Sequence, residues 1–560
     1  MSKYRTLGLV GEGQFGRVFC GVVRKTGELV ALKEVDQRFP TKKFLRELRF
    51  LVMLNHPNIV TCQGLEHHQN KRYLVMDYCE GGTLRDLLVK ELSIVAKLKL
   101  ISDILQGIEY AHNKDVIHRD LKPENILLNL TATGWNARIS DFGVAKLMEE
   151  IDLPLSTSLG DTGSPAYMAP EQFYGKYSPA SDIYAIGIIL FELLVGERPF
   201  IGTPNELMLA HLNQPVEIPS TVPFLLRSAI ITALQKLPQR RFASGTEMLK
   251  SIKNAAEVLG IIYKSPLLLT QAKITSTPTI VTQKYLAASV NLMIVMADDI
   301  YLSMGHVISC YHLGTEFREE WQVKLQNEVI ELNPHPSGCF AQTNTALYWL
   351  GGAVIFQIVQ SKKLLTAIEP GGNWLAFAGQ INKSKFTGGI INFPVLNQIN
   401  QEIEAPFPSQ LIILDQRHGL AILPTENGTR FQIFNRRGVW LESFFLPIPL
   451  KLVTGNLSEP FTIFAVEKNY PGFGLLINLR PFKVTRFALE ISPDFVVENN
   501  GGYVLAESQG KVLTINSRGE GDRLYEVPGK ITAIAPMANN HILIATSSNN
   551  QNYLLKIDLN

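Results

Sequence analysis

The stretch His118-Arg119-Asp120-Leu121-Lys122-Pro123-Glu124-Asn125 is followed, sixteen residues past Asn125, by Asp141-Phe142-Gly143. A short apolar run just before the second motif, Ala137-Arg138-Ile139-Ser140, predicts a strand that ends at Asp141. A carboxylate, a lysine and an amide within six positions, with a second carboxylate at the end of a strand, indicate a polar site on a folded scaffold.

The residue types of these two motifs suit the transfer of a phosphoryl group. Asp120 can orient a substrate hydroxyl and accept its proton. Asn125 and Asp141 offer the oxygen ligands that Mg²⁺ prefers, and Lys122 can steady the transferring group. Such a transfer depends on positioning and charge neutralisation more than on covalent chemistry, so one base, two metal ligands and one cation are what it needs.

A glycine-rich stretch, Gly11-Glu12-Gly13-Gln14-Phe15-Gly16-Arg17-Val18, follows the apolar run at residues 7–10. Glycines let a backbone approach phosphate oxygens and donate N–H groups to them. A dinucleotide site or a plain hairpin turn has the same pattern. A dinucleotide site needs a helix directly after the glycines, whereas residues 18–33 are typical of two strands around a turn at Lys25-Thr26-Gly27.

Lys33 lies on the second of these strands, 22 residues beyond Gly11, and Glu47 falls on a helical pattern at residues 42–54. A strand lysine and a glutamate on a neighbouring helix can form an ion pair that aims the ammonium at phosphates. Taken alone, the two are more often solvated surface charges. The motifs described above favour the ion pair.

The chain resembles the eukaryotic-type (Hanks-type) Ser/Thr protein kinases over residues 4–260. The resemblance rests on the motifs above and on His56-Pro57-Asn58-Ile59-Val60, Ala169-Pro170-Glu171, Asp182 with Gly187, and Arg241. It implies an α+β bilobal fold, with a small β-rich lobe, a larger helical lobe, and ATP and Mg²⁺ between them. It also implies transfer of the ATP γ-phosphoryl group to protein hydroxyls, with Lys33, Glu47, Asp120 and Lys122 as the catalytic residues.

The resemblance also implies individual roles. Met76 is the gatekeeper, the backbones of Asp77 and Cys79 reach adenine, and Val18, Ala31 and Leu128 cover the ring. The full nucleotide set is Leu9, Val10, Gly11, Glu12, Gly13, Gln14, Phe15, Gly16, Arg17, Val18, Ala31, Lys33, Met76, Asp77, Cys79 and Leu128, with Asn125 and Asp141 for the metal. The residues with structural roles are His118, Phe142, Leu51, Glu171, Asp182 and Arg241.

Ser/Thr specificity is implied by Lys122-Pro123-Glu124, because tyrosine kinases usually carry an arginine nearby. Two positions depart from the family. Ser164 stands where threonine is usual, and it keeps a hydroxyl able to contact Asp120 and Lys122. Lys236-Leu237-Pro238 lacks the aspartate that often lies between lysine and proline.

The hydroxyl residues of the activation segment are Ser156, Thr157, Ser158 and Thr162, followed by Ser164. Arg119 beside Asp120 leaves a guanidinium near this segment, and a phosphate on the segment would neutralise it and order the loop. We expect autophosphorylation at one or more of the first four, with Thr162 favoured because it is close to Gly163. A polar loop without modification is the alternative.

The character of the chain changes near residue 265. Residues 244–259, capped by Ser244 or Thr246, form the last helical pattern. Short β-rich segments follow, and their apolar cores recur about every 41 residues. The cores are MIVMA (293–297), CFAQ (339–342), WLAFA (374–378), GLAIL (419–423), TIFAV (462–466), YVLAE (503–507) and ILIAT (542–546).

Seven such units predict an all-β domain, a seven-bladed β-propeller with four strands per blade. Any long antiparallel assembly spaces its strands in a similar way. We therefore expect a kinase domain at 1–262, a linker at 263–275 and a β-propeller-like repeat domain at 276–560. The arrangement is similar to that of bacterial kinases with a propeller-like C-terminal domain, which implies a sensor or scaffold role.

Composition excludes several classes. The 560 residues carry a net charge of +2 with no polybasic cluster, so neither nucleic-acid binding nor membrane adsorption is expected. The five cysteines form no CxxC pair. The N-terminus lacks a signal-peptide pattern, and the apolar stretch at 183–195 is too short to span a bilayer. These features predict a cytoplasmic protein. The kinase resemblance implies that its partners are protein substrates with Ser or Thr, with a possible protein or ligand partner for the propeller.

Two alternatives stay open. A pseudokinase would keep the fold and act as a binding scaffold, but its usual mark is the loss of Lys33, Asp120, Asn125 or Asp141, all of which are present. In the second alternative the propeller is the main agent, binding a ligand, a partner or the substrates, with the kinase as its output.

Overall fold

The computed structural model describes residues 3–13, 16–35, 52–68, 71–90, 92–131, 134–142, 165–260, 275–276, 278–313, 317–351, 354–360, 363–380, 386–392, 397–403, 407–538, 540–548 and 551–559. The chain divides into two compact units. The first comprises Met1–Leu269 with Arg480–Val484, and the second comprises Thr270–Leu479 with Thr485–Asn560.

The first unit begins with a five-stranded antiparallel sheet in the order β1-β2-β3-β5-β4. Its strands are β1 (Tyr4–Gly13), β2 (Gly16–Val23), β3 (Leu29–Val35), β4 (Cys62–His68) and β5 (Lys71–Asp77). Alternate residues of a strand face opposite sides, so Val30 and Leu32 enter a core with Tyr4, Tyr73 and Val75. The predicted hairpin at residues 18–33 is confirmed as β2 and β3.

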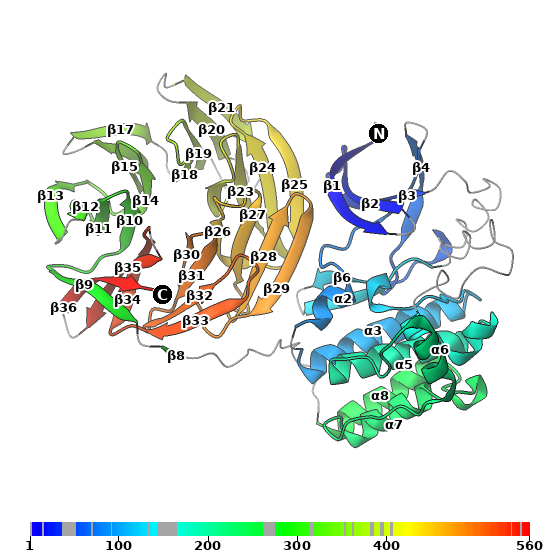
Figure 1. The fold of residues 1–560 in the computed structure, drawn as a ribbon. Coiled ribbons are helices and arrows are strands. Elements are labelled where there is room, and N and C mark those ends of the chain that lie inside the picture. Colours follow the sequence, from blue (N-terminus) through cyan, green and yellow to red (C-terminus); the bar gives the residue numbers. More distant parts are fainter. Residues whose placement is uncertain are drawn as a thin grey trace. The chain divides into compact units, whose positions relative to one another are not determined.

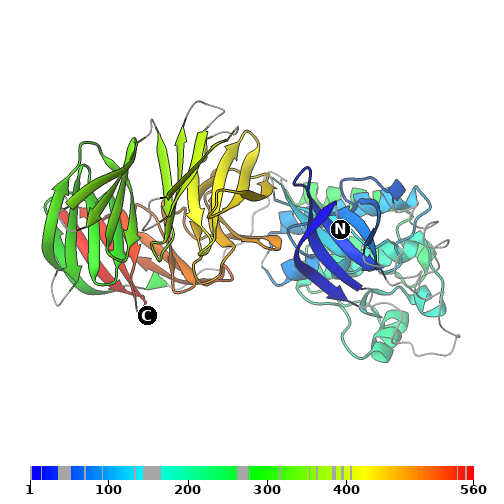
Figure 2. The same cartoon turned by 90° about the horizontal axis from the view of Figure 1, so that it is seen from above.

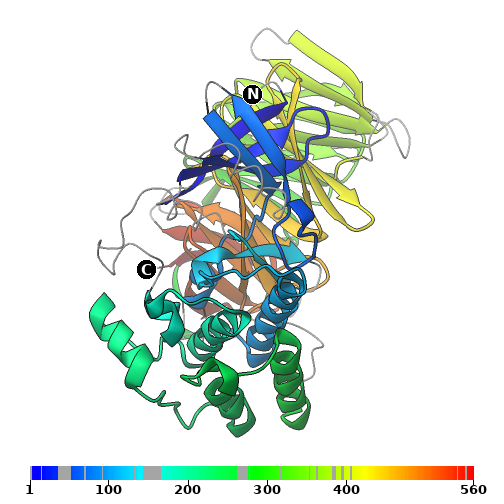
Figure 3. The same cartoon turned by 90° about the vertical axis from the view of Figure 1, so that its right-hand side faces the viewer.

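The rest of the first unit is mainly helical, and Figures 1 and 3 show its cyan and green helices apart from the blue strands. The elements are α2 (Leu84–Leu88), α3 (Ile94–His112), η1 (Pro123–Asn125), β6 (Ile126–Thr131), β7 (Gly134–Ile139), η2 (Pro165–Tyr167), η3 (Pro170–Tyr174), α5 (Pro179–Val195), α6 (Pro204–Asn213), α7 (Phe224–Ala233), η4 (Pro238–Arg240) and α8 (Gly245–Val258).

Side-chain caps begin three of these helices, and at α2 the Thr83 side chain accepts a hydrogen bond from the N–H of Asp86. Ser93 accepts a hydrogen bond from the N–H of Ala96 at the start of α3, and Ser244 accepts one from Glu247 at the start of α8. The predicted cap Ser244 is thus confirmed. The apolar stretch at 183–195 lies in α5, most of whose residues are buried. In the described part of the chain, no helix combines the length and the apolar character needed to cross a bilayer.

The second unit is all β, as predicted, and consists of small antiparallel sheets (Figures 1 and 2). Its strands are β8 (Thr275–Ser276), β9 (Thr279–Leu286), β10 (Leu292–Met296), β11 (Asp299–Met304), β12 (Val307–Leu313), β13 (Phe317–Lys324), β14 (Val329–His335), β15 (Gly338–Thr343), β16 (Ala346–Gly351), β17 (Val354–Gln360), β18 (Leu364–Ile368), β19 (Trp374–Gln380), β20 (Phe386–Asn392), β21 (Asn397–Ile403), β22 (Gln410–Ile413), β23 (His418–Thr425), β24 (Gly428–Asn435), β25 (Trp440–Leu446), β26 (Leu450–Gly455), β27 (Thr462–Glu467), β28 (Phe473–Leu479), β29 (Phe482–Ala488), β30 (Phe495–Asn499), β31 (Gly502–Ala506), β32 (Lys511–Ile515), β33 (Gly521–Glu526), β34 (Lys530–Pro536), β35 (His541–Ser548) and β36 (Gln551–Asp558).

These strands form seven sheets among the described residues. Six of them contain four consecutive strands, and one of these six also includes β8. The first strand of each sheet contacts the first strand of the next, from β10 through β14, β18, β22, β26 and β30 to β34, and β34 contacts β10. The seventh sheet joins both ends of the unit, because β9 pairs antiparallel with β36. The short strand β8 pairs parallel with β33.

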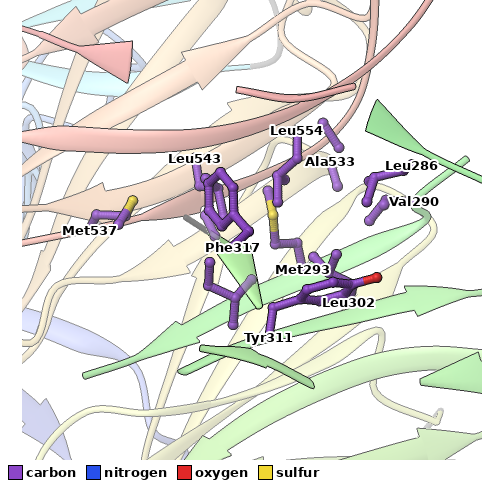
Figure 4. Packing of buried hydrophobic residues seen from close by; sticks show 13 residues of the cluster. Leu286, Val290, Met293, Leu302, Tyr311, Phe317, Ala533, Met537, Leu543 and Leu554 are labelled. Carbon is purple, nitrogen blue, oxygen red and sulfur yellow. The ribbon is translucent and has the colours of Figure 1, made fainter. Parts of the chain in front are cut away.

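A hydrophobic cluster ties the first and last sheets together (Figure 4). It brings Met293 and Leu302 of the first sheet against Leu543 and Leu554 of the last, all of them buried. Burying apolar side chains is the main stabilising contribution in such packing. The N-terminal and C-terminal ends of this unit are therefore held by side-chain packing as well as by the β9–β36 pairing.

The sequence repeat was predicted correctly except at its first position. Six of the seven apolar cores lie on the second strand of their sheets, from β15 to β35, whereas the core at 293–297 lies on β10, a first strand. The equivalent second strand is β11. Its buried residues are Ile300, Tyr301, Leu302 and Ser303, so polar types alternate with apolar ones, and this alternation hid the strand from a search for apolar runs.

Candidate active site

The glycine-rich stretch forms the hairpin between β1 and β2, in which Gly11 is paired with Val18 and Gly13 with Gly16. Gly16 has φ 117°, and a Cβ there would lie 2.4 Å from the carbonyl oxygen of Glu34. Only glycine is compatible with that backbone and that approach. Leu9, Val10 and Glu12 lie on β1, and Arg17 on β2 pairs with Glu34 at 3.3 Å. Gln14 and Phe15 lie outside the described residues.

The predicted adenine-covering residues share one face of this sheet. Val18 lies opposite Lys33, and Ala31 lies opposite Met76 on β5. Because residues opposite each other in antiparallel strands point to the same side, Val18, Ala31, Lys33 and Met76 face away from the core that contains Val30 and Leu32. Leu128, which is predicted to cover the adenine ring from the opposite side, lies on β6 and is buried.

Asp77 and Cys79 follow Met76, the predicted gatekeeper; Asp77 is the last residue of β5, and Cys79 lies between β5 and α2. The N–H of Asp77 donates to the carbonyl of Thr61 at 3.0 Å, and its carboxylate pairs with Arg138 at 2.6 Å. Burial raises the pKa of the Cys79 thiol to about 12, and its Sγ lies 3.2 Å from Asn129 Oδ1. A thiol in this state is inert, so the expected contribution of Cys79 is its backbone.

Lys33 is buried, and its ammonium lies 2.6 Å from Asp141 Oδ1. Burial by itself would raise the pKa of Asp141, but the charge and the hydrogen bond of Lys33 lower it. Asp141 is therefore an ionised carboxylate at neutral pH. Glu47, the predicted partner of Lys33, lies outside the described residues, and the ion pair that the structure describes is the one with Asp141.

Asp120, Lys122 and Asn125 form one connected group at η1. Lys122 Nζ lies 3.0 Å from Asp120 Oδ2, and Asn125 Nδ2 donates to the Asp120 carbonyl at 2.7 Å and to its carboxylate at 3.2 Å. These bonds engage the amide nitrogen of Asn125 and leave its oxygen available. The N–H of Ser140, just before Asp141, donates to the Asn125 carbonyl at 2.8 Å. The Ser140 hydroxyl donates to the same carbonyl at 3.0 Å, so two hydrogen bonds from Ser140 to Asn125 join the two motifs.

Asp182, near the start of α5, holds the backbone that presents Asp120. Its carboxylate accepts the N–H of His118 and the N–H of Arg119, each at 2.9 Å, and contacts His112 Nε2 at 2.8 Å. Arg119 and Asp141 both have left-handed backbones, with φ 76° and 62°. Such conformations cost free energy outside glycine and persist where surrounding bonds hold them.

His118 has the packed position that was predicted for it. It is 1% exposed, its Nε2 lies 2.7 Å from the Ser140 carbonyl, and its ring meets the ring of Phe142 edge-on at 4.8 Å. Its Nδ1 accepts the N–H of Asp120 at 3.4 Å. Both ring nitrogens are engaged with backbone, so His118 braces the two motifs and has no free nitrogen for acid–base chemistry.

Glu171 and Arg241 form a two-pronged ion pair, with Nη1–Oε1 and Nη2–Oε2 distances both of 2.7 Å. The Arg241 side chain is fully buried and lies over the ring of Tyr184 at 4.8 Å. Burial would raise the pKa of Glu171, yet the bonds from Arg241 lower it. The pair joins η3 to the segment after η4, 70 positions apart, and both residues are among those for which the resemblance implied a structural role.

A second charged cluster was not predicted. Arg85 on α2 donates to Glu124 at 2.8 Å and to Glu192 at 2.6 Å, and it also donates to the hydroxyl of Tyr167. Tyr167 in turn donates to Glu192 at 2.5 Å. The cluster ties α2 and α5 to Glu124 in η1 and to η2. Its members are spread over more than 100 positions, and no local pattern pairs them.

Several predicted residues lie outside the described residues and cannot be placed. They are Gln14, Phe15, Glu47, Leu51, Ser156, Thr157, Ser158, Thr162 and Ser164.

The donor set at this site suits Mg²⁺. Asn125 and Asp141 offer two oxygens, and among the described residues no group of three or more His, Cys, Asp or Glu forms a separate metal cage. Mg²⁺ is usually held by one or two protein carboxylates together with substrate phosphates and water. The ammonium groups of Lys33 and Lys122 provide the complementary charge for phosphates.

A small sheet carrying a glycine-rich hairpin and a lysine, followed by a helical part with an Asp-Lys-Asn group and a second aspartate, defines the protein kinase class. Residues 4–252 match the protein kinase domain family. The N-terminal region of this chain is therefore similar to protein kinase domains in its sequence, its fold and its site.

Curated relatives agree with this assignment. The chain is similar to the probable serine/threonine-protein kinase PknB of Lactococcus lactis, at 32% identity over 46% of this chain and 42% of that protein. It is also similar to the serine/threonine-protein kinase PkaA of Streptomyces coelicolor, at 34% identity over 46% of this chain and 51% of that protein. CBL-interacting serine/threonine-protein kinase 21 of Arabidopsis thaliana is 38% identical over 36% of this chain and 48% of its own length. The chain thus spans about half the length of these relatives.

Proposed function

We propose that this chain is an active Ser/Thr protein kinase that transfers the γ-phosphoryl group of ATP to hydroxyls of protein substrates. The observation that carries the proposal is the connection of Lys33, Asp120, Lys122, Asn125 and Asp141. They are linked by two ion pairs, Lys33–Asp141 and Lys122–Asp120. Hydrogen bonds between Asn125 and Asp120 and between Ser140 and Asn125 complete the connection. A pseudokinase has no need of this set, so the enzyme is the better interpretation.

In the proposed mechanism Asp120 orients the substrate hydroxyl and accepts its proton at a carboxylate oxygen. Lys122, paired with the same carboxylate, faces the transferring group, and Lys33 binds phosphate oxygens beneath the glycine-rich hairpin. Asn125 and Asp141 would hold Mg²⁺, which when bound supplies positive charge against the phosphates. The backbone of Asp77 and Cys79 would bind adenine, with Val18, Ala31 and Leu128 around it.

The test is transfer of radiolabelled phosphate from ATP with Mg²⁺ to a generic protein substrate and to the chain itself. We expect wild type to transfer phosphate and Lys33→Met and Asp120→Asn to lose at least about 100-fold in rate. Lys71→Met is the matched control. Lys71 is also a lysine of this sheet that pairs with a carboxylate, Glu34 at 2.6 Å, but its side chain is 41% exposed. An inactive wild type would favour the scaffold alternative.

The activation segment offers a regulatory step. Arg119 Nε is buried and has no hydrogen-bond partner among the described residues, while its guanidinium lies 5.5 Å from the ring centroid of Tyr177. This supports a phosphate acceptor at Ser156, Thr157, Ser158 or Thr162, with Thr162 favoured. Mapping phosphosites on wild type and Asp120→Asn tests it. An unmodified wild type with full activity would contradict this step and leave the transfer reaction intact.

We further propose that the second unit is a seven-bladed β-propeller that senses a ligand or binds a partner or substrate. Two observations support a closed ring of sheets. The first strands of successive sheets contact one another from β10 to β34, with β34 contacting β10 again, and β9 pairs with β36. The corresponding domains are 1–262, a linker at 263–275, and 276–560. Activity of residues 1–270 compared with the full chain tests the control of catalysis by this domain, since equal rates and equal substrate preference would argue against it.

A further inference from the structure

Arg138, on β7, bonds to three separate segments of the first unit. Its Nε and Nη2 donate to the Ile59 carbonyl at 3.1 and 2.7 Å, and Nη2 also donates to the Asp77 carboxylate at 2.6 Å. Its Nη1 donates to Asn129 Oδ1 on β6 at 3.4 Å. The side chain is 14% exposed. A planar guanidinium presents five N–H donors in fixed directions, so one arginine can hold these acceptors together.

Asn129, the β6 residue that this guanidinium reaches, bonds to the rest of the connecting segment, which we define as residues 77–80. Its Nδ2 donates to the Tyr78 carbonyl at 3.3 Å and to the Glu80 carboxylate at 2.8 Å. Its Oδ1 accepts the Cys79 thiol at 3.2 Å. Each residue of the connecting segment is thus bonded to a side chain of the two-stranded sheet β6–β7.

The same two-stranded sheet carries other predicted contacts of ATP. Leu128, predicted to cover the adenine ring, lies on β6, and β7 ends two positions before the predicted metal ligand Asp141. The backbones of Asp77 and Cys79 are the predicted adenine contacts. The bonds from β6 and β7 therefore fix the adenine-binding backbone relative to the metal ligand.

The contact between Arg138 and Asp77 is an ion pair with no substitute among the other bonds of this carboxylate. Burial by itself would raise the pKa of Asp77, but the hydrogen bonds from Arg138 and from Gln63 Nε2, at 3.1 Å, lower it. Gln63 lies on β4, in the same sheet as Asp77, so its bond does not reach β7. A hydrogen bond between two charged groups is also stronger than one between neutral groups.

We propose that Arg138 is a positioning residue for ATP, which holds the connecting segment and Asp141 in the arrangement that one bound nucleotide needs. Arg138 acts through Asp77 and Asn129 and is assigned no contact with the nucleotide itself. The inference rests on the proposed kinase function and adds a residue to its nucleotide site.

The position of the proton acceptor does not depend on this arginine. Asp120 is held by Lys122 and by Asn125, and its neighbouring backbone is held by Asp182. Loss of Arg138 is therefore expected to weaken nucleotide binding much more than it slows transfer from bound ATP. A residue that only stabilised the fold would not separate these two quantities.

The experiment uses the full chain with Mg²⁺. Calorimetry measures binding of adenosine 5′-(β,γ-imido)triphosphate, which is not hydrolysed, and a transfer assay gives the KM for ATP, the KM for the acceptor protein and kcat. Arg138→Met is expected to raise the Kd of the analogue and the KM for ATP about tenfold, with much smaller changes in the KM for the acceptor and in kcat. Arg138→Lys should recover part of the loss, because an ammonium can pair with Asp77 but cannot reproduce the fork of bonds to Ile59.

Asp77→Asn tests the pair from its other side, because it removes the charge and keeps the backbone. It should weaken the analogue several-fold, and the double variant Arg138→Met/Asp77→Asn should bind no more weakly than Arg138→Met alone. Lys99→Met is the matched control. Lys99 pairs with Asp103 at 2.5 Å and donates to Asn136 on the same strand β7 at 3.3 Å, and neither partner belongs to the connecting segment. Its replacement should leave nucleotide binding unchanged.

Three results would overturn the inference: Arg138→Met binds the analogue as tightly as wild type; Lys99→Met weakens it equally, which indicates a general loss of stability; or the effects of Arg138→Met and Asp77→Asn add in full. If Arg138→Met does not fold, Arg138→Lys and Asp77→Asn decide, because wild-type binding in both would exclude the role. A wild type that binds the analogue but transfers no phosphate contradicts the kinase proposal alone, and the comparison of binding constants still tests Arg138.

Discussion

The ammonium of Lys33 lies 2.6 Å from the carboxylate of Asp141, although 108 positions separate the two residues. The Lys33 side chain is 7% exposed and that of Asp141 is 31% exposed. The pair connects the small sheet to the segment after β7, and the bond of Ser140 to Asn125 connects both to the stretch at 118–125. One ion pair thus sets the position of the predicted metal ligand.

Replacing Lys33 with methionine is expected to lower the free energy of unfolding at neutral pH by about 1 kcal/mol, since Asp141 is partly screened by solvent. The pKa of Asp141 is lowered in the folded protein. The ionised Asp141 therefore stabilises the folded protein at pH values above the ordinary aspartate pKa. This stabilisation is lost as the pH falls through the pKa of Asp141 in the folded protein. The difference between Lys33→Met and wild type should shrink in acid. Urea unfolding at several pH values checks this, and a difference that is independent of pH would contradict it.

The ion pair of Glu171 and Arg241 predicts a large effect of a single truncation. Arg241→Met leaves the Glu171 carboxylate partly buried without its partner, and we expect a loss of about 3–5 kcal/mol. Arg240→Met is the matched control, because the neighbouring Arg240 is exposed and its loss should cost less than about 0.5 kcal/mol. Denaturant unfolding measures both variants. Equal losses would show that the pair is not specifically stabilising.

His211 predicts a pH dependence of stability. It is 0% exposed, its Nδ1 lies 2.8 Å from the Tyr184 hydroxyl, and Phe200 packs against its ring. Burial, together with the charge of Lys236, lowers its pKa to about 3. Between that value and the ordinary histidine pKa the unfolded chain binds a proton that the folded chain does not, so stability falls with falling pH.

We expect this residue to account for a loss of about 1 kcal/mol between roughly pH 6 and pH 5, and His211→Gln to remove that part of the slope. Glutamine can still accept the Tyr184 hydroxyl. The control is His67→Gln, at an exposed histidine of the same unit. Thermal unfolding across the pH range provides the measurement, and an unchanged slope in His211→Gln would refute the assignment.

In the second unit, Arg486 and Glu467 form a buried ion pair, with exposures of 4% and 1% and bonds of 2.6 and 3.0 Å. Arg486 also lies 4.0 Å from the centroid of the Phe473 ring. Arg486→Met alone should cost about 3–5 kcal/mol, because Glu467 then stays buried and unpaired. The double variant Arg486→Met/Glu467→Leu should regain most of that loss. Calorimetry on both variants tests this, and a double variant as unstable as the single one would exclude it.

The sequence alone determined the local elements and the order of the motifs. The glycine-rich hairpin, the capped helix at Ser244, the buried helix around residues 183–195 and six of the seven repeat cores follow from periodicity, glycine and capping residues, which act within a few positions of the chain. The motif order also identified the kinase domain. The first repeat core was misplaced because β11 buries Tyr301 and Ser303, which a hydrophobic pattern does not reveal.

Tertiary structure alone decided which distant charges meet. No pattern in the chain joins Arg85 to Tyr167 and Glu192, or Arg486 to Glu467. Pairing between residues far apart in the sequence depends on how whole sheets and helices pack. The residues around a position influence its local conformation, but they do not determine which distant residue it contacts. The same reason applies to β9 and β36, whose pairing joins the two ends of the second unit.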